Sequence, residues 1–317
     1  MKNVHGRAIT SQRSSYFENP VHHVDLVKSI SSGAVPLKYA YAGSAAFTHD
    51  RYASTADYAG MMANAVSESD TLLSAGVEDL AAHSVAELGP GNGLHSIAFL
   101  RSLSERGRIF RRYLAMDFSA TLLGIATARL RESFDHDFLV DTTVWDVEEQ
   151  QSLCVERWRT GEKGVLVCML GHTLGNFEDP AQALHNLGVG LRDGDILLVS
   201  VLLRPSPAFM ESALTAYRAD AFRCAALEPL LAAGLNLTDL DLTLRYDDSA
   251  VVGEVTLLRD ARLDDMDLPG GHHFRCFLSR RFGRDEVVRL IEQTGWSIRA
   301  AQVDETDHHM TVVAARG

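Results

Sequence analysis

The sequence lacks the features that mark several large classes of protein. Its four cysteines are scattered without a C-x-x-C pair, which is typical of reduced, buried thiols rather than of a disulfide framework. Its longest apolar runs, near residues 165–170 and 196–203, are about half the length that crosses a bilayer. The first residues, MKNVHGRAIT, hold no apolar stretch of the kind that a signal peptide requires. We therefore expect a cytoplasmic protein that does not enter a membrane.

Positive charge is also in deficit. The chain carries 30 lysines and arginines against 42 aspartates and glutamates, a formal net charge of −12. A surface of this sign repels phosphate backbones, which argues against a nucleic acid as partner. At 317 residues, with 46% hydrophobic and 23% charged residues, the chain has the composition of an ordinary globular protein with two domains or one large one. We expect a small molecule as its partner, and the sequence leaves the oligomeric state open.

Short apolar segments alternate with helix patterns through the middle of the chain. The apolar segments are nearly continuous, as in strands covered on both faces, and amphipathic stretches such as LHSIAFLRSL separate them. This alternation predicts a doubly wound α/β sheet of parallel strands. The predicted strands are 85–89, 113–117, 142–146, 164–171 and 195–203.

The alternation stops after Leu203 and resumes near the C-terminus. Residues 204–275 predict a helix around 212–231 followed by strands, whereas the last segment predicts a helix and two strands joined at 305–307. Two strands joined so closely predict an antiparallel hairpin at the edge of the sheet. We therefore predict an α/β domain formed by residues 60–203 with 276–317. Residues 1–59 with 204–275 would form a smaller α+β lobe.

The clearest local signal is a glycine-rich segment, E-L-G-P-G-N-G, which runs from Glu87 and follows a predicted strand. Its glycines allow a ligand to approach the backbone and allow a helix to start close to the strand. A dinucleotide fingerprint would need Gly or Ala near Leu94, and a P-loop would need Gly-Lys-Ser/Thr, which is absent. The spacing of Gly89, Gly91 and Gly93 instead resembles motif I of class I S-adenosylmethionine (SAM)-dependent methyltransferases, although such a turn can also be purely structural.

Two aspartates stand at the ends of the next two predicted strands. Asp117 could accept hydrogen bonds from two vicinal ribose hydroxyls, and Asp146 could accept one from an adenine amino group. Each alone could instead be a helix N-cap, as in the segment Asp117-Phe-Ser119. Because the carboxyl ends of parallel strands lie at one edge of a sheet, the recurrence predicts a nucleoside site there.

The fourth predicted strand ends at a loop with the sequence G-H-T-L-G-N, from Gly171 to Asn176. This loop would face the same edge of the sheet, although Asn176 could also be a simple turn residue. His172 could act as a base, but we do not assign it that role. Histidine pairs such as His22-His23 point to opposite faces of a strand and lack the spacing of metal ligands, so we predict no metal site.

Over most of its length the chain resembles the histidine-specific SAM-dependent methyltransferases, typified by the ergothioneine-pathway L-histidine Nα-methyltransferase. It is also similar to relatives that N-methylate tryptophan-derived amino acids in secondary metabolism. The matching segments are V-A-E-L-G-P-G, A-M-D-F-S, G-H-T-L-G-N, Y-A-Y-A-G-S-A-A-F from Tyr39, T-A-Y at 215–217 and the segment 282–286 before the last helix. The resemblance implies a Rossmann-like class I fold, SAM as methyl donor and S-adenosylhomocysteine (SAH) as product.

The resemblance also implies roles for particular residues. Asn176 and Tyr217 would be catalytic, holding the amine and the carboxylate of an amino acid. Donor-binding residues would be Glu87, Gly89, Gly91, Gly93, His95, Asp117, Phe118, Asp146, Val147 and Gly171. Substrate-binding residues would be Tyr39, Phe47, Tyr52, His172, Asn176, Tyr217, Phe277 and Ser279.

Two departures from the family pattern matter. The family has a lysine where this chain has His95, so the contact to the carboxylate of the donor differs. The E-x-S pattern that grips imidazole becomes Phe277-Leu-Ser279, which predicts a more apolar or aromatic substrate than histidine. We therefore expect N-methylation of a small amino acid or amino-acid-derived metabolite. The alternatives are O-methylation of a small metabolite and a donor-binding subunit that has lost turnover; Leu94 argues against a nicotinamide dehydrogenase.

Overall fold

The computed structural model describes residues 17, 19–61, 63–76, 84–161, 164–206, 210–247 and 249–316. The chain divides into two compact units. The seven-strand unit comprises Ala59–Phe118, Leu123–Ser206 and Arg280–Gly317, and the three-strand unit comprises Met1–Tyr58, Ser119–Leu122 and Pro207–Ser279. The domain boundaries proposed from the sequence stay a prediction.

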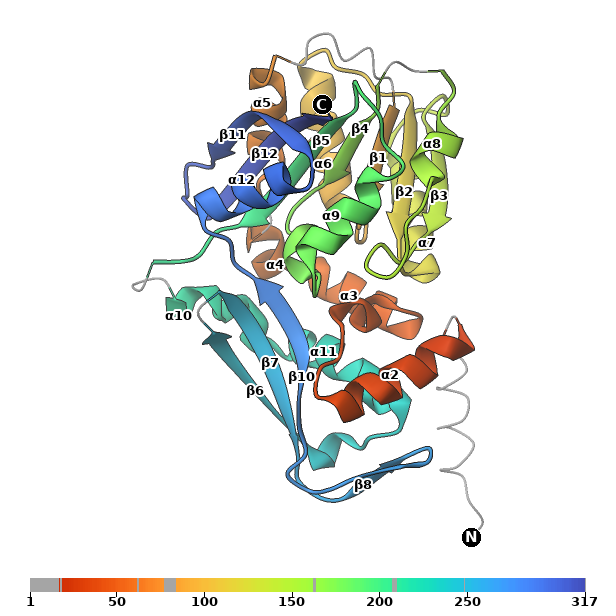
Figure 1. The fold of residues 1–317 in the computed structure, drawn as a ribbon, viewed down its shortest axis with the longest axis vertical. Coiled ribbons are helices and arrows are strands. Elements are labelled where there is room, and N and C mark those ends of the chain that lie inside the picture. Colours follow the sequence, from red (N-terminus) through yellow and green to blue (C-terminus); the bar gives the residue numbers. More distant parts are fainter. Residues whose placement is uncertain are drawn as a thin grey trace. The chain divides into compact units, whose positions relative to one another are not determined.

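A seven-stranded sheet forms the centre of the seven-strand unit (Figure 1). Its strands are β1 (Ser84–Leu88), β2 (Arg112–Asp117), β3 (Leu139–Val144), β4 (Leu166–Met169), β5 (Ile196–Leu202), β11 (Trp296–Val303) and β12 (His309–Arg316). They lie in the order β11-β12-β5-β4-β1-β2-β3. β1 to β5 pair in parallel, whereas β12 is antiparallel to both β5 and β11. The predicted parallel α/β sheet and its antiparallel C-terminal hairpin are confirmed.

The burial of the strands explains their sequences. Every residue of β1, β4 and β5 is buried, which is why these segments are nearly continuous apolar runs. β3 is an edge strand with mostly exposed side chains, and it ends at Val144 rather than at the predicted Asp146. The Trp145 amide still donates to the Asp117 carbonyl of β2 at 2.8 Å, and the Trp145 side chain lies in the core, where its Nε1–H donates to the carbonyl of Gln150 at 2.9 Å.

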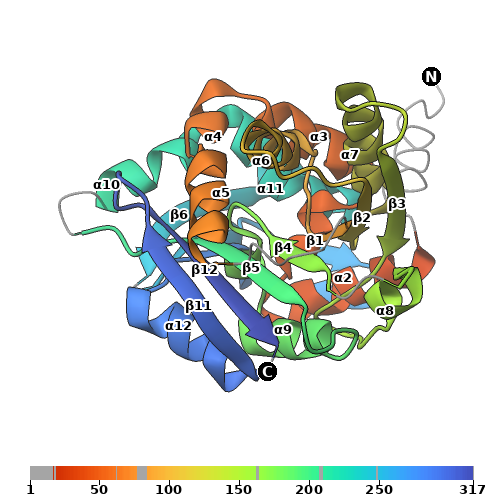
Figure 2. The ribbon, with the colours of Figure 1, turned by 90° about the horizontal axis from the view of Figure 1, so that it is seen from above.

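Helices cover both faces of this sheet (Figure 2). One face carries α5 (Ala65–Ser74), α6 (Leu94–Glu105) and α7 (Ala120–Ser133), and the other carries α8 (Cys154–Trp158), α9 (Pro180–Gly188) and α12 (Arg284–Gln293). Phe99 and Leu103 pack in the first layer, and Leu184 and Ile291 pack in the second. Burying one such side chain contributes about 1.5–3 kcal/mol to the stability of the fold. The two helix layers therefore stabilise the sheet that carries the loops at its edge.

The three-strand unit combines short helices with a small sheet of order β10-β7-β6. Its strands are β6 (Leu240–Asp247), β7 (Ala250–Leu257) and β10 (His273–Arg280), with a separate hairpin of β8 (Ala261–Leu263) and β9 (Met266–Leu268). Its helices include α2 (Pro20–Ser32), η1 (Leu37–Tyr41), α3 (Ser44–Ala53) and η6 (Leu237–Asp239), and α4 (Ala56–Met61) spans the division between the units. β6 and β7 pair antiparallel.

The helix predicted around 212–231 is broken in the structure. It consists of α10 (Met210–Ala213), the 3₁₀ turn η5 (Thr215–Arg218) and α11 (Asp220–Ala233). Tyr217 lies in the turn and is buried, with its hydroxyl 3.1 Å from Ser279 Oγ of β10. This long-range contact, which no local pattern in the sequence encodes, favours the turn over a continuous helix.

Candidate functional site

The glycine loop between β1 and α6 places its three glycines in the left-handed region, with φ of +71° at Gly89, +57° at Gly91 and +82° at Gly93. A Cβ on Gly89 would come within 2.6 Å of Thr173 Cγ2, and one on Gly93 within 3.1 Å of Ala126 Cα. A Cβ on Gly91 would meet nothing within 4 Å. Gly89 and Gly93 are therefore needed for packing, whereas Gly91 borders open space that a ligand can occupy.

The loop that follows β4 is tied to the glycine loop. The Thr173 hydroxyl lies 3.2 Å from the carbonyl oxygens of both Gly89 and Leu170. Thr173 begins the 3₁₀ turn η3 (Thr173–Asn176), so the predicted catalytic residue Asn176 stands at the end of this turn. The two loops thus form one rigid edge.

The two predicted acidic residues follow the neighbouring strands. Asp117 is the last residue of β2 and only 8% exposed, and Asp146 follows β3 by two residues. Ser119 accepts a hydrogen bond from the Leu122 amide at the start of α7. Because β1 to β4 are parallel, the glycine loop, Asp117, Asp146 and Gly171 all lie at the carboxyl edge of the sheet.

Glu87, predicted to bind the donor, lies inside the α6 face of the sheet. Tyr113 donates a hydrogen bond of 2.5 Å to Glu87 Oε2. Burial raises the pKa of Glu87 to about 7, although the hydrogen bond from Tyr113 opposes the rise. In this position the carboxyl group supports the strand beneath the glycine loop, and its assignment to the donor remains a prediction.

A second buried carboxylate, Glu68, was not found by sequence analysis. It lies in α5, between the segment that starts at Tyr39 and the glycine loop, and its Oε2 is 2.7 Å from Nε2 of the predicted donor residue His95. Its Oε1 accepts a hydrogen bond of 3.0 Å from the Gly171 amide. The one available signal was its position four residues before the buried Leu72, which places a carboxylate on the core-facing side of the helix.

His172 is held in place by both of its ring nitrogens. Nδ1 accepts a hydrogen bond of 2.9 Å from the Leu202 amide, and Nε2 lies 3.2 Å from Nη1 of Arg281. Burial and the nearby charge of Arg281 hold the pKa of His172 well below its usual value. A Cβ on Gly175 would lie 2.1 Å from the ring, so the loop is shaped around it. Because Nδ1 accepts from the Leu202 amide, the neutral ring carries its proton on Nε2, so it fixes the loop and is poorly suited to act as a base.

Several predicted substrate residues form an aromatic cluster in the three-strand unit. The rings of Tyr217 and Phe277 are 5.2 Å apart, and both contact Phe222, at 5.1 and 4.7 Å respectively. Tyr52 joins through Phe222 at 5.8 Å. Ser279 joins through its contact with the Tyr217 hydroxyl. The structure thus brings together Tyr52, Tyr217, Phe277 and Ser279, and it adds Phe222, which the sequence did not indicate.

Two other predicted substrate residues are placed differently. Tyr39 is buried with its ring 6.3 Å from that of His22, and Phe47 is 55% exposed on α3. Both come from the N-terminal Y-x-x-x-G-S-x-x-F segment, where Ser44 donates a hydrogen bond of 2.8 Å to Glu228 of α11. This bond anchors the segment to the helix that carries Phe222.

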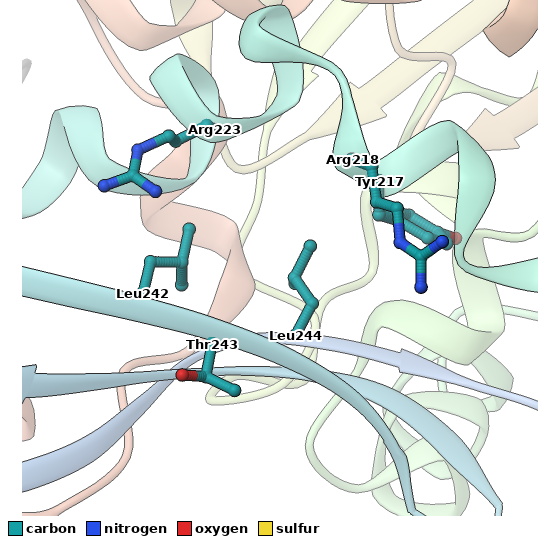
Figure 3. A pocket seen from close by; sticks show the side chains of 6 residues that line it. All are labelled: Tyr217, Arg218, Arg223, Leu242, Thr243 and Leu244. Carbon is teal, nitrogen blue, oxygen red and sulfur yellow. The ribbon is translucent and has the colours of Figure 1, made fainter. Parts of the chain in front are cut away.

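A pocket of about 380 Å³ lies beside Tyr217 (Figure 3). Leu242, Thr243 and Leu244 of β6 line one wall, and Arg218 and Arg223 flank it from the helical side. Arg218 also forms an exposed ion pair with Glu211 at 2.5 Å. Two guanidinium groups over an apolar wall are suited to a ligand that carries a carboxylate.

The edge of the seven-stranded sheet fits an adenosyl sulfonium ligand. Gly91 leaves room beside the backbone, and Asp117 and Asp146 place carboxylates at the ends of the next two strands, a residue type that can accept hydrogen bonds from hydroxyl and amino groups. The sheet order, the glycine loop after β1 and the acidic end of β2 together define a SAM-dependent methyltransferase with a Rossmann-like sheet.

The chain belongs to the histidine-specific, SAM-dependent methyltransferase family, whose sequence model matches residues 63–316. The family membership, the enzyme class and the cofactor predicted from the sequence are thereby confirmed. No curated protein matches the chain.

The chain is similar to several solved methyltransferase structures, at low sequence identity. The magnesium protoporphyrin IX methyltransferase of Synechocystis PCC 6803 is 11% identical, with a TM-score of 0.47 over 87% of this chain and 96% of that one. The 1,6-didemethyltoxoflavin-N1-methyltransferase of Burkholderia thailandensis is 13% identical, with a TM-score of 0.44 over 95% and 93%. An amino pentose methyltransferase from Micromonospora echinaspora is 14% identical, with a TM-score of 0.42 over 84% and 94%.

Proposed function

We propose that the enzyme transfers a methyl group to the amine of a small amino acid, or of an amino-acid-derived metabolite, other than histidine. The contact between Phe277 and Tyr217 carries this proposal. Where the related histidine enzymes have E-x-S, this chain has Phe277 and Ser279 on one face of β10, and both side chains contact Tyr217. A phenyl ring has no carboxylate oxygen to accept the N–H of an imidazole, whereas it packs well against an aromatic or aliphatic side chain.

The chemistry requires alignment more than it requires a base. When bound, SAM supplies an electrophilic methyl group on a sulfonium centre. Deprotonating an amine with a pKa near 8 costs about 1 kcal/mol at pH 7, and a free amino acid costs somewhat more. Alignment of the reacting atoms is worth about 7–11 kcal/mol. The engaged ring of His172 supports a mechanism in which no protein base is essential.

The acceptor is assigned to Asn176 and Tyr217. The amide oxygen of Asn176 would accept an N–H of the amine and so direct the nitrogen lone pair, and Tyr217 would donate to the substrate carboxylate. The guanidinium groups of Arg218 and Arg223, in the pocket that Tyr217 lines, support an acceptor that carries a negative charge.

The donor is assigned to the edge of the seven-stranded sheet. The residues proposed to contact it are Gly89, Gly91, Gly93, His95, Asp117, Phe118, Asp146, Val147 and Gly171. Phe118 is half-buried beside Asp117, whereas Val147 is buried in the core, so Phe118 is the better placed of the two for a ligand contact.

A substrate screen tests the proposal. The purified enzyme is incubated with SAM and single amino acids or biogenic amines, SAH formation is measured, and mass spectrometry locates the new methyl group. We expect SAH with an aromatic or apolar amino acid, little with histidine, and the methyl on nitrogen. Histidine as the best acceptor would contradict the proposal, and a methyl on oxygen would identify an O-methyltransferase. Binding of SAH without turnover of any acceptor would identify a subunit that has lost activity.

The setting of the reaction is part of the proposal. Among the described residues, no helix is both long and apolar enough to span a bilayer, and no cluster of three or more potential metal ligands occurs. We propose a small-molecule acceptor in the cytoplasm, with neither a membrane nor a nucleic acid as partner.

A further inference from the structure

We propose that Glu68 is a positioning residue of the donor site, which acts by holding His95 ready to receive the carboxylate at the methionine end of SAM. The inference rests on the proposed assignment of His95 and Gly171 to that site. Glu68 lies outside every motif that pointed to the donor, and no family feature noted above includes it.

The geometry of Glu68 carries the inference. The side chain is 0% exposed, and its two oxygens accept from three segments of the seven-strand unit. Oε2 is 2.7 Å from His95 Nε2 at the start of α6, and Oε1 is 3.0 Å from the Gly171 amide in the loop after β4. Asn64 Nδ2 donates to the same Oε1 at 3.0 Å and to Ser200 Oγ of β5 at 2.6 Å. One carboxylate therefore joins the glycine-loop helix to the β4 loop.

A fully buried carboxylate is expensive to maintain. It is tolerated in a protein interior only when several donors compensate its charge, and removal of a partner usually costs more than the pair contributes. Burial alone would raise the pKa of Glu68, but the charge and hydrogen bond of His95, with the Gly171 amide, bring this pKa below its usual value. The group is thus ionised at neutral pH.

The ionised carboxylate changes what His95 can do. A lysine at this position, as in the related enzymes, is cationic at neutral pH without help, whereas an imidazole titrates near pH 6.5. A neighbouring carboxylate favours the protonated imidazole. In the described part of the chain, the other titratable groups that interact with Glu68 or His95 are Glu87 of β1, Cys168 of β4 and His309 of β12. Burial raises the pKa of Cys168 well above its usual value and lowers the pKa of His309 to about 4, so both of these groups remain neutral. Glu68 is therefore the group that lets a histidine replace the lysine.

A control variant on the same helix distinguishes the proposed positioning role of Glu68 from a purely structural role. Ser69 is also 0% exposed in α5, but its hydroxyl lies 2.6 Å from Ser102 Oγ of α6 and contacts neither donor loop. The variant Ser69→Ala removes a buried hydrogen bond of the same helix without touching His95.

The experiment measures SAH binding by calorimetry, with unfolding temperature recorded for each variant. We expect Glu68→Gln to weaken SAH binding about 10-fold, because glutamine keeps an acceptor for the Gly171 amide but loses the charge. Glu68→Ala should weaken it about 30-fold or more, and Ser69→Ala should leave it unchanged. Because Glu68 acts through His95, Glu68→Gln combined with His95→Ala should bind SAH no more weakly than His95→Ala alone.

A spectroscopic measurement tests the contact between Glu68 and His95 directly, in the ligand-free protein and without an activity assay. In an NMR titration, the His95 imidazole should lose its proton at lower pH in Glu68→Gln than in the unaltered protein. Unchanged SAH affinity in Glu68→Gln, additive effects with His95→Ala, or an unchanged titration would overturn the inference.

The variant Asp117→Ala distinguishes a wrong role for Glu68 from a wrong donor site. If Asp117→Ala weakens SAH binding while Glu68→Gln does not, only the role of Glu68 is wrong. If neither does, the donor site itself is misplaced.

Discussion

In the proposed function, the edge of the seven-stranded sheet and the aromatic cluster of the three-strand unit recognise their ligands by different means. The sheet edge relies on backbone geometry and carboxylates, with Gly91 open beside the chain and Asp117 at a strand end. The aromatic cluster relies on packed rings, with Phe277 and Tyr217 against Phe222. A site built from backbone geometry tolerates few substitutions and therefore keeps binding the same methyl donor. In a site built from packed rings, a single substitution can change which acceptor fits. The comparison predicts that donor binding and acceptor choice can be altered separately.

The largest expected effect separates turnover from donor binding. Asn176→Ala removes the amide that is proposed to orient the amine, so turnover should fall by about 1,000-fold, a fraction of what alignment supplies. SAH affinity, measured by calorimetry, should stay within about twofold because no donor contact is lost. Normal turnover in this variant would show that the amine is held elsewhere.

The converse variant affects the donor first. Asp117→Ala removes the carboxylate that is proposed to accept two hydrogen bonds from the ribose, each worth about 1.5–3 kcal/mol, so SAH affinity should fall about 100-fold. Asp137→Ala, which changes an exposed aspartate before β3, is the control and should bind SAH normally. Unchanged affinity in Asp117→Ala would mean that the ribose is not at the end of β2.

The pH dependence of the free energy of unfolding tests the buried carboxyl group of Glu87, beneath the glycine loop. The pKa of Glu87 is raised to about 7, so the stability it contributes is fully present below its unfolded value and is lost as pH rises through 7. Glu87→Gln removes this loss, and its free energy of unfolding relative to the unaltered protein should rise between pH 5 and pH 8, by at most about 3 kcal/mol. Urea unfolding at both pH values measures the difference. A constant difference would show that Glu87 is ionised throughout.

The smallest expected effect concerns acceptor choice. Phe277→Glu adds a carboxylate beside Tyr217, so the ratio of kcat/KM for histidine to that for the best apolar acceptor should rise about 10-fold. Phe277→Leu, which removes the ring without adding charge, should reduce turnover of aromatic acceptors and leave histidine a poor substrate. An identical response to Glu and Leu would mean that Phe277 does not face the acceptor side chain.

The same contrast explains what the sequence could predict. The buried strands, the glycine loop and the C-terminal hairpin depend on local patterns, and each was found. Glu68 and Phe222 were missed because their importance depends on partners far away in the chain, Gly171 in one case and Phe277 in the other. The break at Tyr217 was missed for the same reason, since its contact with Ser279 spans the insertion. Glu87 was assigned to the donor from the glycine-rich motif. Its hydrogen bond from Tyr113, on the neighbouring strand β2, cannot be predicted from that motif.

A crystal structure of the protein with SAH tests the central claim most directly. The account predicts electron density for the nucleoside beside Gly91, with the ribose hydroxyls on the carboxylate of Asp117 and the adenine near Asp146. SAH bound away from the carboxyl ends of β1 to β4, or a sheet edge filled by side chains of the protein itself, would contradict it.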